Sequence, residues 1–232
     1  MIDNIFVRAS LADTHSDLYR NIVSLRVSEN LFDDLSTDPQ DWHTAIAVEL
    51  DAKPPPFISK VPVIYRPFEE AVWNDAIDYP FKNWIRSRFS DGSFGIWYGC
   101  DRIETSVHET VYHWRNSFLL DAGFTRPGIK IDRKIYSVRC DAVLIDFRHV
   151  VTEFPALIDP DDYTLTQQIG ARLHREGHPG LASKSARFDG DSYAVLNPNL
   201  LSNPRQNCIL TYVTTDTGIA VERQPGVVWF EI

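Results

Sequence analysis

The chain has 232 residues, which is enough to bury a substantial core in one domain or in one domain with a small appendage. Its formal net charge of -9 argues against a general nucleic-acid-binding protein, because neutralising phosphates requires a basic surface. Three widely spaced cysteines, with no secretory signal and no run of about 18 apolar residues, favour a cytoplasmic protein without a disulfide framework, zinc site or membrane segment.

Residues 1–50 show a loose helical period. Carboxylates lie opposite an apolar stripe formed by Leu11, Leu18, Ile22, Leu25 and Leu31. A second helix is expected from about residue 39 to residue 50, because Asp38 can cap its first turn and Pro39 suits that turn. The sequence therefore predicts an N-terminal helical extension over residues 1–60.

Three consecutive prolines in the stretch 51–57 cannot continue a helix. One interpretation is a linker between the helical extension and a main domain over residues 61–232. The other interpretation is a loop inside a single domain, and composition does not separate the two.

The main domain is expected to open with a strand at residues 61–67. The segment from Tyr79 to Arg88 that follows is the only locally basic and aromatic part of the chain. A patch that stacks bases and binds nucleic-acid phosphates is one interpretation. A small ligand with a diphosphate accounts for the same residues with less surface, so we expect no direct nucleic-acid contact.

A glycine-rich loop comes next and runs into a short aromatic strand that ends at Tyr98. Glycines in such a loop permit positive φ and a close approach of backbone to ligand, which favours a cleft here; they are Gly92, Gly95 and Gly99.

A helix carrying Glu109 is expected after this strand. Asp101 can cap its first turn, and Glu104 three residues later forms a pair that resembles a capping box. The stripe expected to be buried consists of Ile103, Val107, Val111 and Trp114. Glu109 lies off this stripe, and on spacing alone it is most simply a solvated carboxylate. The histidines at 108 and 113 are five residues apart, whereas a metalloprotease helix needs them four apart, so no metal is expected.

The remainder predicts an α+β domain. Strands are expected at residues 134–140 and 142–147 with a turn at Asp141, and a helix at 161–176 that ends at Gly177. Ser185 follows in a loop or strand. The last expected strands cover residues 193–196, 208–213 and 227–232.

One set of spacings has a counterpart in a known family. Arg88 is followed after ten residues by Tyr98 and after eleven more by Glu109 in Glu-Thr-Ser-Val-His-Glu, and much later by Ser185-Ala186-Arg187 after a Gly-Leu segment. In order and spacing, this pattern resembles the RES domain over roughly residues 62–215. The family usually has Gly-Arg-Trp-Asn where this chain has Ser-Arg-Phe-Ser, a difference that concerns the phosphate contacts and not the arginine itself.

The resemblance implies a mixed, mostly antiparallel β core of the ADP-ribosyltransferase type with flanking helices, similar to diphtheria toxin and poly-ADP-ribose polymerases. It also implies the toxin of a bacterial toxin–antitoxin pair that consumes NAD⁺ as its substrate. The expected partner is a cognate antitoxin with an Xre-like helix-turn-helix.

Residue roles follow from the same resemblance. NAD⁺ cleavage needs an anchor for the diphosphate, a face for the nicotinamide and a carboxylate near the developing positive charge, for which Arg88, Tyr98 and Glu109 are the candidates. Ser185 is expected to form a hydrogen bond at the nicotinamide end. Arg66 and Arg187 are weaker candidates, either for ligand charge or for structural ion pairs.

The acceptor of ADP-ribose is open at this point. The N-terminal extension offers surface for recognising a protein, which favours protein ADP-ribosylation, and water or phosphate are the alternatives. A catalytically silent module that only binds another protein is a hypothesis of a different class. Measuring the release of nicotinamide from NAD⁺ distinguishes an enzyme from a silent binding module.

Overall fold

The computed structural model describes residues 2–23, 76–120, 123 and 126–232. The helix expected at 39–50, the proline-rich stretch, the strand at 61–67 and Arg66 lie outside the described residues. The domain boundary expected near residue 60 lies there as well.

One eight-stranded sheet forms the framework, in the order β1-β2-β5-β4-β3-β6-β7-β8. The strands are β1 (Ser10–Val23), β2 (Trp97–Cys100), β3 (Lys130–Asp146), β4 (Gly180–Lys184), β5 (Asp191–Val195), β6 (Leu201–Thr214), β7 (Ile219–Gln224) and β8 (Val227–Glu231). Every strand pair is antiparallel except β3 with β4. With helices packed beside the sheet, this confirms the mixed, mostly antiparallel α+β fold.

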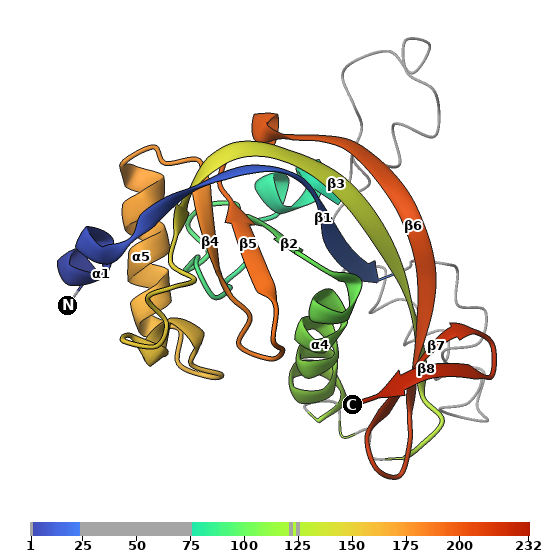
Figure 1. Ribbon diagram of the computed structural model, residues 1–232. Coiled ribbons are helices and arrows are strands. Elements are labelled where there is room, and N and C mark those ends of the chain that lie inside the picture. The colour runs from blue at the N-terminus through green and yellow to red at the C-terminus, as the bar shows by residue number, and fades with distance from the viewer. Residues whose placement is uncertain (1, 24–75, 121–122, 124–125) are drawn as a thin grey trace.

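Strand β3 organises the sheet. Over its 17 residues, one edge pairs with the whole of β1, and the other edge is shared between β6 and β4. Figure 1 shows β1 and β3 arching side by side above β4, β5 and β2. Because β1 also pairs with β2 at Tyr19 and Cys100, the pairings close a circuit through β1, β2, β5, β4 and β3.

The turn expected at Asp141 is wrong, because β3 runs through this position without a break. Asp141 lies opposite His15 of β1, and its carboxylate accepts hydrogen bonds from His15 Nδ1 (2.8 Å) and Arg139 Nε (3.0 Å). An exposed aspartate with such cross-strand partners is tolerated inside a strand.

Among the described residues of this range, the helical expectation holds for α1 (Ile2–Arg8) and is wrong for residues 10–23, which form β1. Thr14 and Leu18 are the buried side chains of β1, and a spacing of four fits one face of a strand as well as one face of a helix. Leu11 is 66% exposed and belongs to no buried stripe. Fourteen paired positions with β3 decide the conformation, because tertiary pairing overrides weak local propensity.

The helices that matter for the site are α4 (Ile103–His113), which continues as a π-helical turn over Trp114–Leu119, and α5 (Thr164–Arg175). Residues 76–82 are also helical, and short 3₁₀ turns cover Pro155–Ile158 and Pro198–Leu200. Helix α5 confirms the helix expected at 161–176, and Gly177 beyond it has φ +75°. Within the described ranges, no helix is long and apolar enough to cross a membrane.

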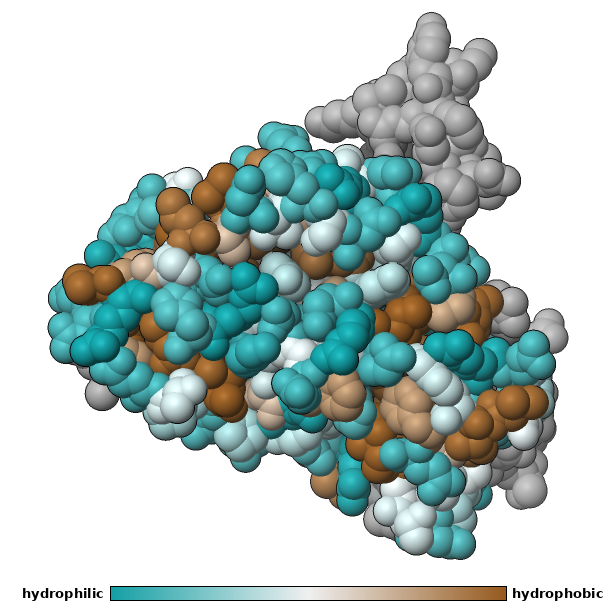
Figure 2. Space-filling view, in the orientation of Figure 1, coloured by the Kyte–Doolittle hydropathy of each residue, from teal (hydrophilic) through white to brown (hydrophobic). Residues whose placement is uncertain are grey.

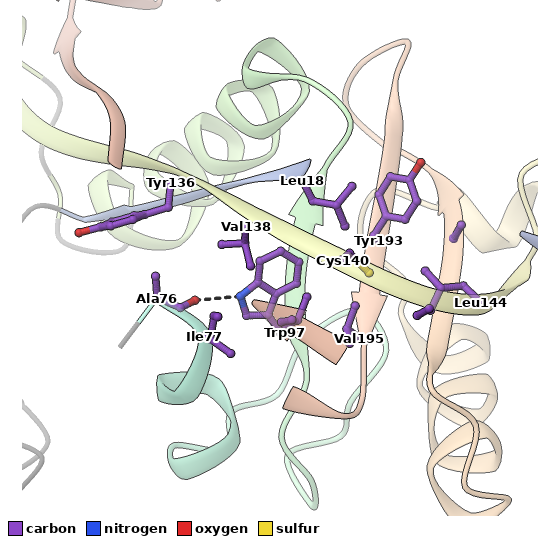
Figure 3. Close-up of a cluster of buried hydrophobic side chains, with 13 residues drawn as sticks. Leu18, Ala76, Ile77, Trp97, Tyr136, Val138, Cys140, Leu144, Tyr193 and Val195 are labelled. Carbon is purple, nitrogen blue, oxygen red and sulfur yellow. Dashed lines mark hydrogen bonds between the residues drawn. The ribbon is translucent and has the colours of Figure 1, made fainter. Parts of the chain in front are cut away.

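Three clusters of buried side chains fill the two faces of the sheet. Around Trp97, the indole N–H donates to the carbonyl of Ala76 (2.8 Å) beside Leu18 of β1 and Val138 of β3 (Figure 3). A second cluster lies between α5 and the sheet, and a third lies between α4 and strands β3, β6 and β7. Hydrophilic residues dominate the face in Figure 2, as expected for a chain with 24% charged residues.

Candidate functional site

Helix α4 presents Glu109 as the apolar stripe predicts. Val107, Val111 and Trp114 are buried, and Ile103 packs against the same cluster. Glu109 lies off this face and is partly exposed. The position of the residue is therefore set by hydrophobic burial on the opposite side of the helix.

The start of α4 differs from the prediction, because the N-cap is Arg102 and no side chain caps the first turn. Asp101 instead accepts hydrogen bonds from Thr105 Oγ1 (2.8 Å) and from the backbone N–H of Asp191 (3.1 Å). Gly190 completes this junction, since a Cβ there would lie 2.1 Å from Thr105 Oγ1. The aspartate thus ties α4 to β5, close to the loop that carries Ser185.

One oxygen of Glu109 is held by the Ser185 loop. Ser185 Oγ donates to Glu109 Oε1 at 2.5 Å, and the backbone N–H of Ala186 donates to the same oxygen at 3.2 Å. The other oxygen, Oε2, has no hydrogen-bond partner among the described residues. The carboxylate is oriented by the protein and keeps one oxygen available.

Ser185 itself is 6% exposed and uses its full hydrogen-bonding capacity within the protein. Besides donating to Glu109, its Oγ accepts from the backbone N–H groups of Arg187 (3.1 Å) and Phe188 (3.2 Å). A hydroxyl has one donor and two acceptor positions, and all three are occupied. These contacts fix the hydroxyl against Glu109.

Tyr98 lies on β2 and is partly exposed. The hydroxyl accepts from the backbone N–H of Phe89 (2.9 Å) and shares a hydrogen bond with Ser87 Oγ (2.9 Å). Burial raises the pKa of Tyr98 to about 12, so the phenol stays neutral at physiological pH. Its two partners flank Arg88 in the sequence, which brings Tyr98 and Arg88 together.

Arg88 is held by neutral groups. Its Nη1 donates to the carbonyl of Asp159 (2.7 Å), and its guanidinium carbon lies 4.5 Å from the centre of the Tyr163 ring. Its Nη2 is buried and has no hydrogen-bond partner. Gly170 of α5 permits this placement, because a Cβ there would lie 1.8 Å from the carbonyl oxygen of Phe89.

Arg187 is held in the same manner. Its Nη2 donates to the carbonyl of Pro160, and its guanidinium lies 3.4 Å from the centre of the Tyr112 ring. Its Nε is buried without a hydrogen-bond partner. Tyr112 belongs to α4, one turn beyond Glu109, so Arg187 reaches the helix that carries the candidate carboxylate.

Neither arginine forms an ion pair with a carboxylate in the described part of the chain. By contrast, Arg148 pairs with both Asp146 and Asp191, at 2.7 and 2.9 Å. A structural ion pair, the alternative expected for Arg187, is therefore not what holds it within the described residues. The positive charge at both site arginines remains available to an anion.

His113, at the end of the helix that carries Glu109, has a lowered pKa. Burial lowers the pKa of His113, the nearby Glu109 carboxylate opposes this effect, and the Arg187 and Arg88 guanidinium groups add to it. Three candidate site residues therefore affect the pKa of this imidazole. Across the described ranges, no three His, Cys, Asp or Glu side chains gather to hold a metal.

The structure brings together five of the six predicted site residues: Arg88, Tyr98, Glu109, Ser185 and Arg187. The sequence analysis missed Tyr163 and Tyr112 as partners of the arginines. The run Asp-Pro-Asp-Asp-Tyr at residues 159–163, just before α5, was the available signal. Such a run is usually a turn and helix start, so it did not point to a ligand site.

A family model described as the RES domain matches residues 63–215, more than half of the chain and close to the range of the resemblance. The fold is similar to a chain of the M. tuberculosis MbcT–MbcA toxin–antitoxin complex, with 10% identity, a TM-score of 0.48, and coverage of 93% of this chain and 92% of that one. No curated protein matches the sequence.

Proposed function

The chain belongs to the RES domain family, and we propose that it is the toxin of a toxin–antitoxin pair that cleaves NAD⁺ at the bond between nicotinamide and ribose. One observation carries the proposal: Ser185 and Ala186 orient the Glu109 carboxylate, Arg187 stacks on Tyr112 one turn further along the same helix, and neither Arg187 nor Arg88 has a carboxylate partner among the described residues. A dinucleotide with a diphosphate and a cationic leaving group suits this combination of charges.

Cleavage breaks the bond between the ribose C1′ and the nicotinamide nitrogen. The electron pair of that bond goes to the nitrogen, so nicotinamide leaves neutral and positive charge develops on the ribose. Glu109 stabilises this charge, and its Oε2 is available to accept a hydrogen bond from a ribose hydroxyl. An interaction that strengthens as the charge develops lowers the barrier rather than the ground state.

Ser185 is proposed to position Glu109 instead of touching nicotinamide. The family resemblance suggested a hydrogen bond at the nicotinamide end, but the hydroxyl already has three protein partners. Holding Oε1 in this way directs Oε2 outward, and a fixed carboxylate does not have to reorganise during the reaction.

Tyr98 supplies the aromatic face. Its hydroxyl is anchored by Phe89 N–H and Ser87, which fixes the ring plane. A neutral phenol on a partly exposed residue suits stacking on the nicotinamide ring. Arg88 and Arg187 supply the donors for the diphosphate, because a guanidinium pairs with phosphate oxygens through two parallel hydrogen bonds.

The acceptor of ADP-ribose is proposed to be a protein, with water and phosphate as the alternatives. Surface for recognising a protein was expected on the N-terminal extension, of which residues 10–23 form a sheet strand. Cell extract incubated with NAD⁺ labelled in the adenylate moiety distinguishes the three. The label appears in a protein band, in free ADP-ribose or in phosphorylated ADP-ribose.

The decisive experiment is incubation of the purified full chain with NAD⁺ and quantification of free nicotinamide. Release well above that of the Glu109→Gln variant is expected. Equal, negligible release from a folded wild type and the variant would instead assign the chain to the protein-binding modules.

A further inference from the structure

Residues 159–163 form a turn, called here the acidic loop, that contacts three side chains of the candidate site. Its first two carbonyls accept hydrogen bonds from the arginines: Asp159 from Arg88 Nη1 at 2.7 Å and Pro160 from Arg187 Nη2. The carboxylate of Asp161 accepts from the Tyr112 hydroxyl. The loop leads directly into α5 (Figure 1).

Tyr163, the last residue of the acidic loop, contacts both arginines. Its ring lies beneath the Arg88 guanidinium at 4.5 Å, and its hydroxyl lies 3.5 Å from Arg187 Nη2. An aromatic face attracts a guanidinium without neutralising it. One side chain therefore sets the relative position of two like charges.

The acidic loop has a fixed shape. The Asp159 carboxylate accepts the backbone N–H groups of Asp161 (2.9 Å) and Asp162 (2.7 Å), and Asp162 accepts that of Thr164 (2.8 Å). These hydrogen bonds lower the pKa of Asp159. One turn further, Gln167 donates to the carbonyl of Ser87 at 2.9 Å, which fastens α5 to the segment that carries Arg88.

The three carboxylates of the acidic loop bind groups other than the arginines, which explains how an acidic loop can lie next to an anion site. Asp159 and Asp162 bind backbone donors, and Asp161 binds Tyr112. None of them forms an ion pair with either arginine. The loop orients both guanidinium groups through neutral carbonyls and a neutral ring, and leaves their charge uncompensated.

Each of the two arginines has one N–H donor without an acceptor. Arg88 Nη2 and Arg187 Nε are buried and lack acceptors. Two like charges that share one aromatic side chain repel each other, and a ligand with several anionic oxygens on the exposed parts of both guanidinium groups removes this cost. Both residues are partly exposed, so such a ligand can approach them.

We propose that the acidic loop is the positioning element for this arginine pair, that Tyr163 is its positioning residue, and that the pair binds a diphosphate with one phosphoryl group at each arginine. The inference rests on the proposed function only for the identity of the dinucleotide. It adds that ADP alone binds, and that its affinity depends on a residue outside the Arg88, Tyr98, Glu109 and Ser185 set.

The test is calorimetric titration of the full chain with ADP and with AMP, for the wild type and three Tyr163 variants. Loss of the ring in Tyr163→Ala is expected to weaken ADP binding about 10-fold, the size of a partly desolvated cation–π contact. Tyr163→Leu, which keeps apolar volume, should show the same loss if the alanine variant unfolds. Tyr163→Phe keeps the ring and should bind within about threefold of the wild type.

A control and a second readout separate positioning from general damage. Trp229→Ala removes an aromatic ring on β8 that lies 3.6 Å from the Arg223 guanidinium, outside the site, and should leave ADP affinity unchanged. With NAD⁺, Tyr163→Ala should raise KM and leave kcat near the wild-type value, because the ring acts on binding of the diphosphate and not on the bond that breaks.

Unchanged ADP affinity in folded Tyr163→Leu, or AMP binding as tight as ADP binding in the wild type, overturns the inference. ADP binding that depends on Tyr163 in a protein that releases no nicotinamide leaves the inference standing and removes the proposed function. The two proposals therefore fail separately.

Discussion

At the scale of single residues, the partner chosen by each arginine separates structural from functional charge. Arg148 binds two carboxylates, which neutralise its charge inside the protein. Arg88 and Arg187 bind carbonyls and aromatic rings, which orient a guanidinium and leave its charge for a ligand. The same logic applies to Glu109, of which one oxygen is held and the other is not.

Replacing Glu109 with Gln is expected to reduce nicotinamide release by about 100-fold or more, because a transition-state electrostatic contact is removed. The fold should survive, since Glu109 lies off the buried stripe of α4. Glu104→Gln, a carboxylate on the same helix, is the matched control and should retain activity. Full activity in folded Glu109→Gln would contradict the mechanism.

Replacing Arg88 with Lys is expected to weaken NAD⁺ binding by about 10-fold or more, because an ammonium group reproduces neither the planar fork nor the stacking on Tyr163. Titration calorimetry with NAD⁺ measures the loss. Arg175→Lys, at the exposed end of α5, should bind as the wild type does. Unchanged affinity in Arg88→Lys would make the arginine structural.

At the scale of elements, β1 and the chain around Asp191 hold the site together from outside it. Strand β1 pairs with β3 along 14 residues and supplies Leu18 to the core. Arg148 links the end of β3 to β5 through Asp146 and Asp191, and Lys184 of β4 binds the same Asp191 at 2.7 Å.

Removal of residues 1–60 is expected to abolish cooperative folding, because it strips β1 from the long edge of β3. A milder change, Leu18→Ala, should lower the free energy of unfolding by about 2–5 kcal/mol, as for other buried leucines. Leu11→Ala is the control, since Leu11 is 66% exposed. A stable, cooperatively folded fragment 61–232 would restore the separable extension that the sequence suggested.

Replacing Arg148 with Met is expected to cost about 2–4 kcal/mol of unfolding free energy, because the largely buried Asp146 loses its ion-pair partner and Asp191 keeps only Lys184. Arg205→Met breaks an exposed pair with Asp17 and should cost at most about 1 kcal/mol. Denaturant unfolding measures both.

The ion pair between Asp146 and Arg148 predicts that the free energy of unfolding depends on pH. Burial acts to raise the pKa of Asp146, but the hydrogen bonds and charge of Arg148 outweigh it and hold the pKa below its usual value. A depressed carboxyl pKa contributes stability above the unfolded-state value of about 4, and this is lost as pH falls through the folded-state value. The stability difference between wild type and Arg148→Met should therefore narrow below about pH 4. A stability difference that stays constant down to pH 2 would exclude the Asp146–Arg148 pair as its cause.

At the scale of the whole molecule, the net charge of -9 leaves little basic surface for reading DNA. A toxin of this kind would leave operator binding to its partner, which the family resemblance suggests carries an Xre-like helix-turn-helix. An antitoxin that covers the surface around Arg88, Tyr98 and Glu109 would silence the proposed site in the simplest way, by blocking the substrate.

Expression of the chain alone is therefore expected to inhibit growth, and co-expression with the cognate antitoxin to relieve it. The purified complex should release nicotinamide far more slowly than the free chain. A complex as active as the free chain, or an antitoxin bound only to the far side without any change at the site, would rule out occlusion.

The sequence by itself determined the local elements and the order of the site residues. The stripe Val107, Val111 and Trp114 specifies which face of α4 is buried, and hence where Glu109 points, because a 3.6-residue period is a local property. Helix α5 and its glycine stop are equally local. The order and spacing of Arg88, Tyr98 and Glu109 resemble the RES domain, and the family model over residues 63–215 confirms that resemblance.

Only the tertiary structure decided what depends on distant partners. Residues 10–23 are a strand because β3 lies beside them, and the four-residue spacing of Thr14 and Leu18 could not distinguish strand from helix. Ser185 and Ala186 reach Glu109 across more than 70 residues of sequence, and the acidic loop reaches Arg88 across a similar span. Such contacts are set by how the sheet closes, which no short-range pattern encodes.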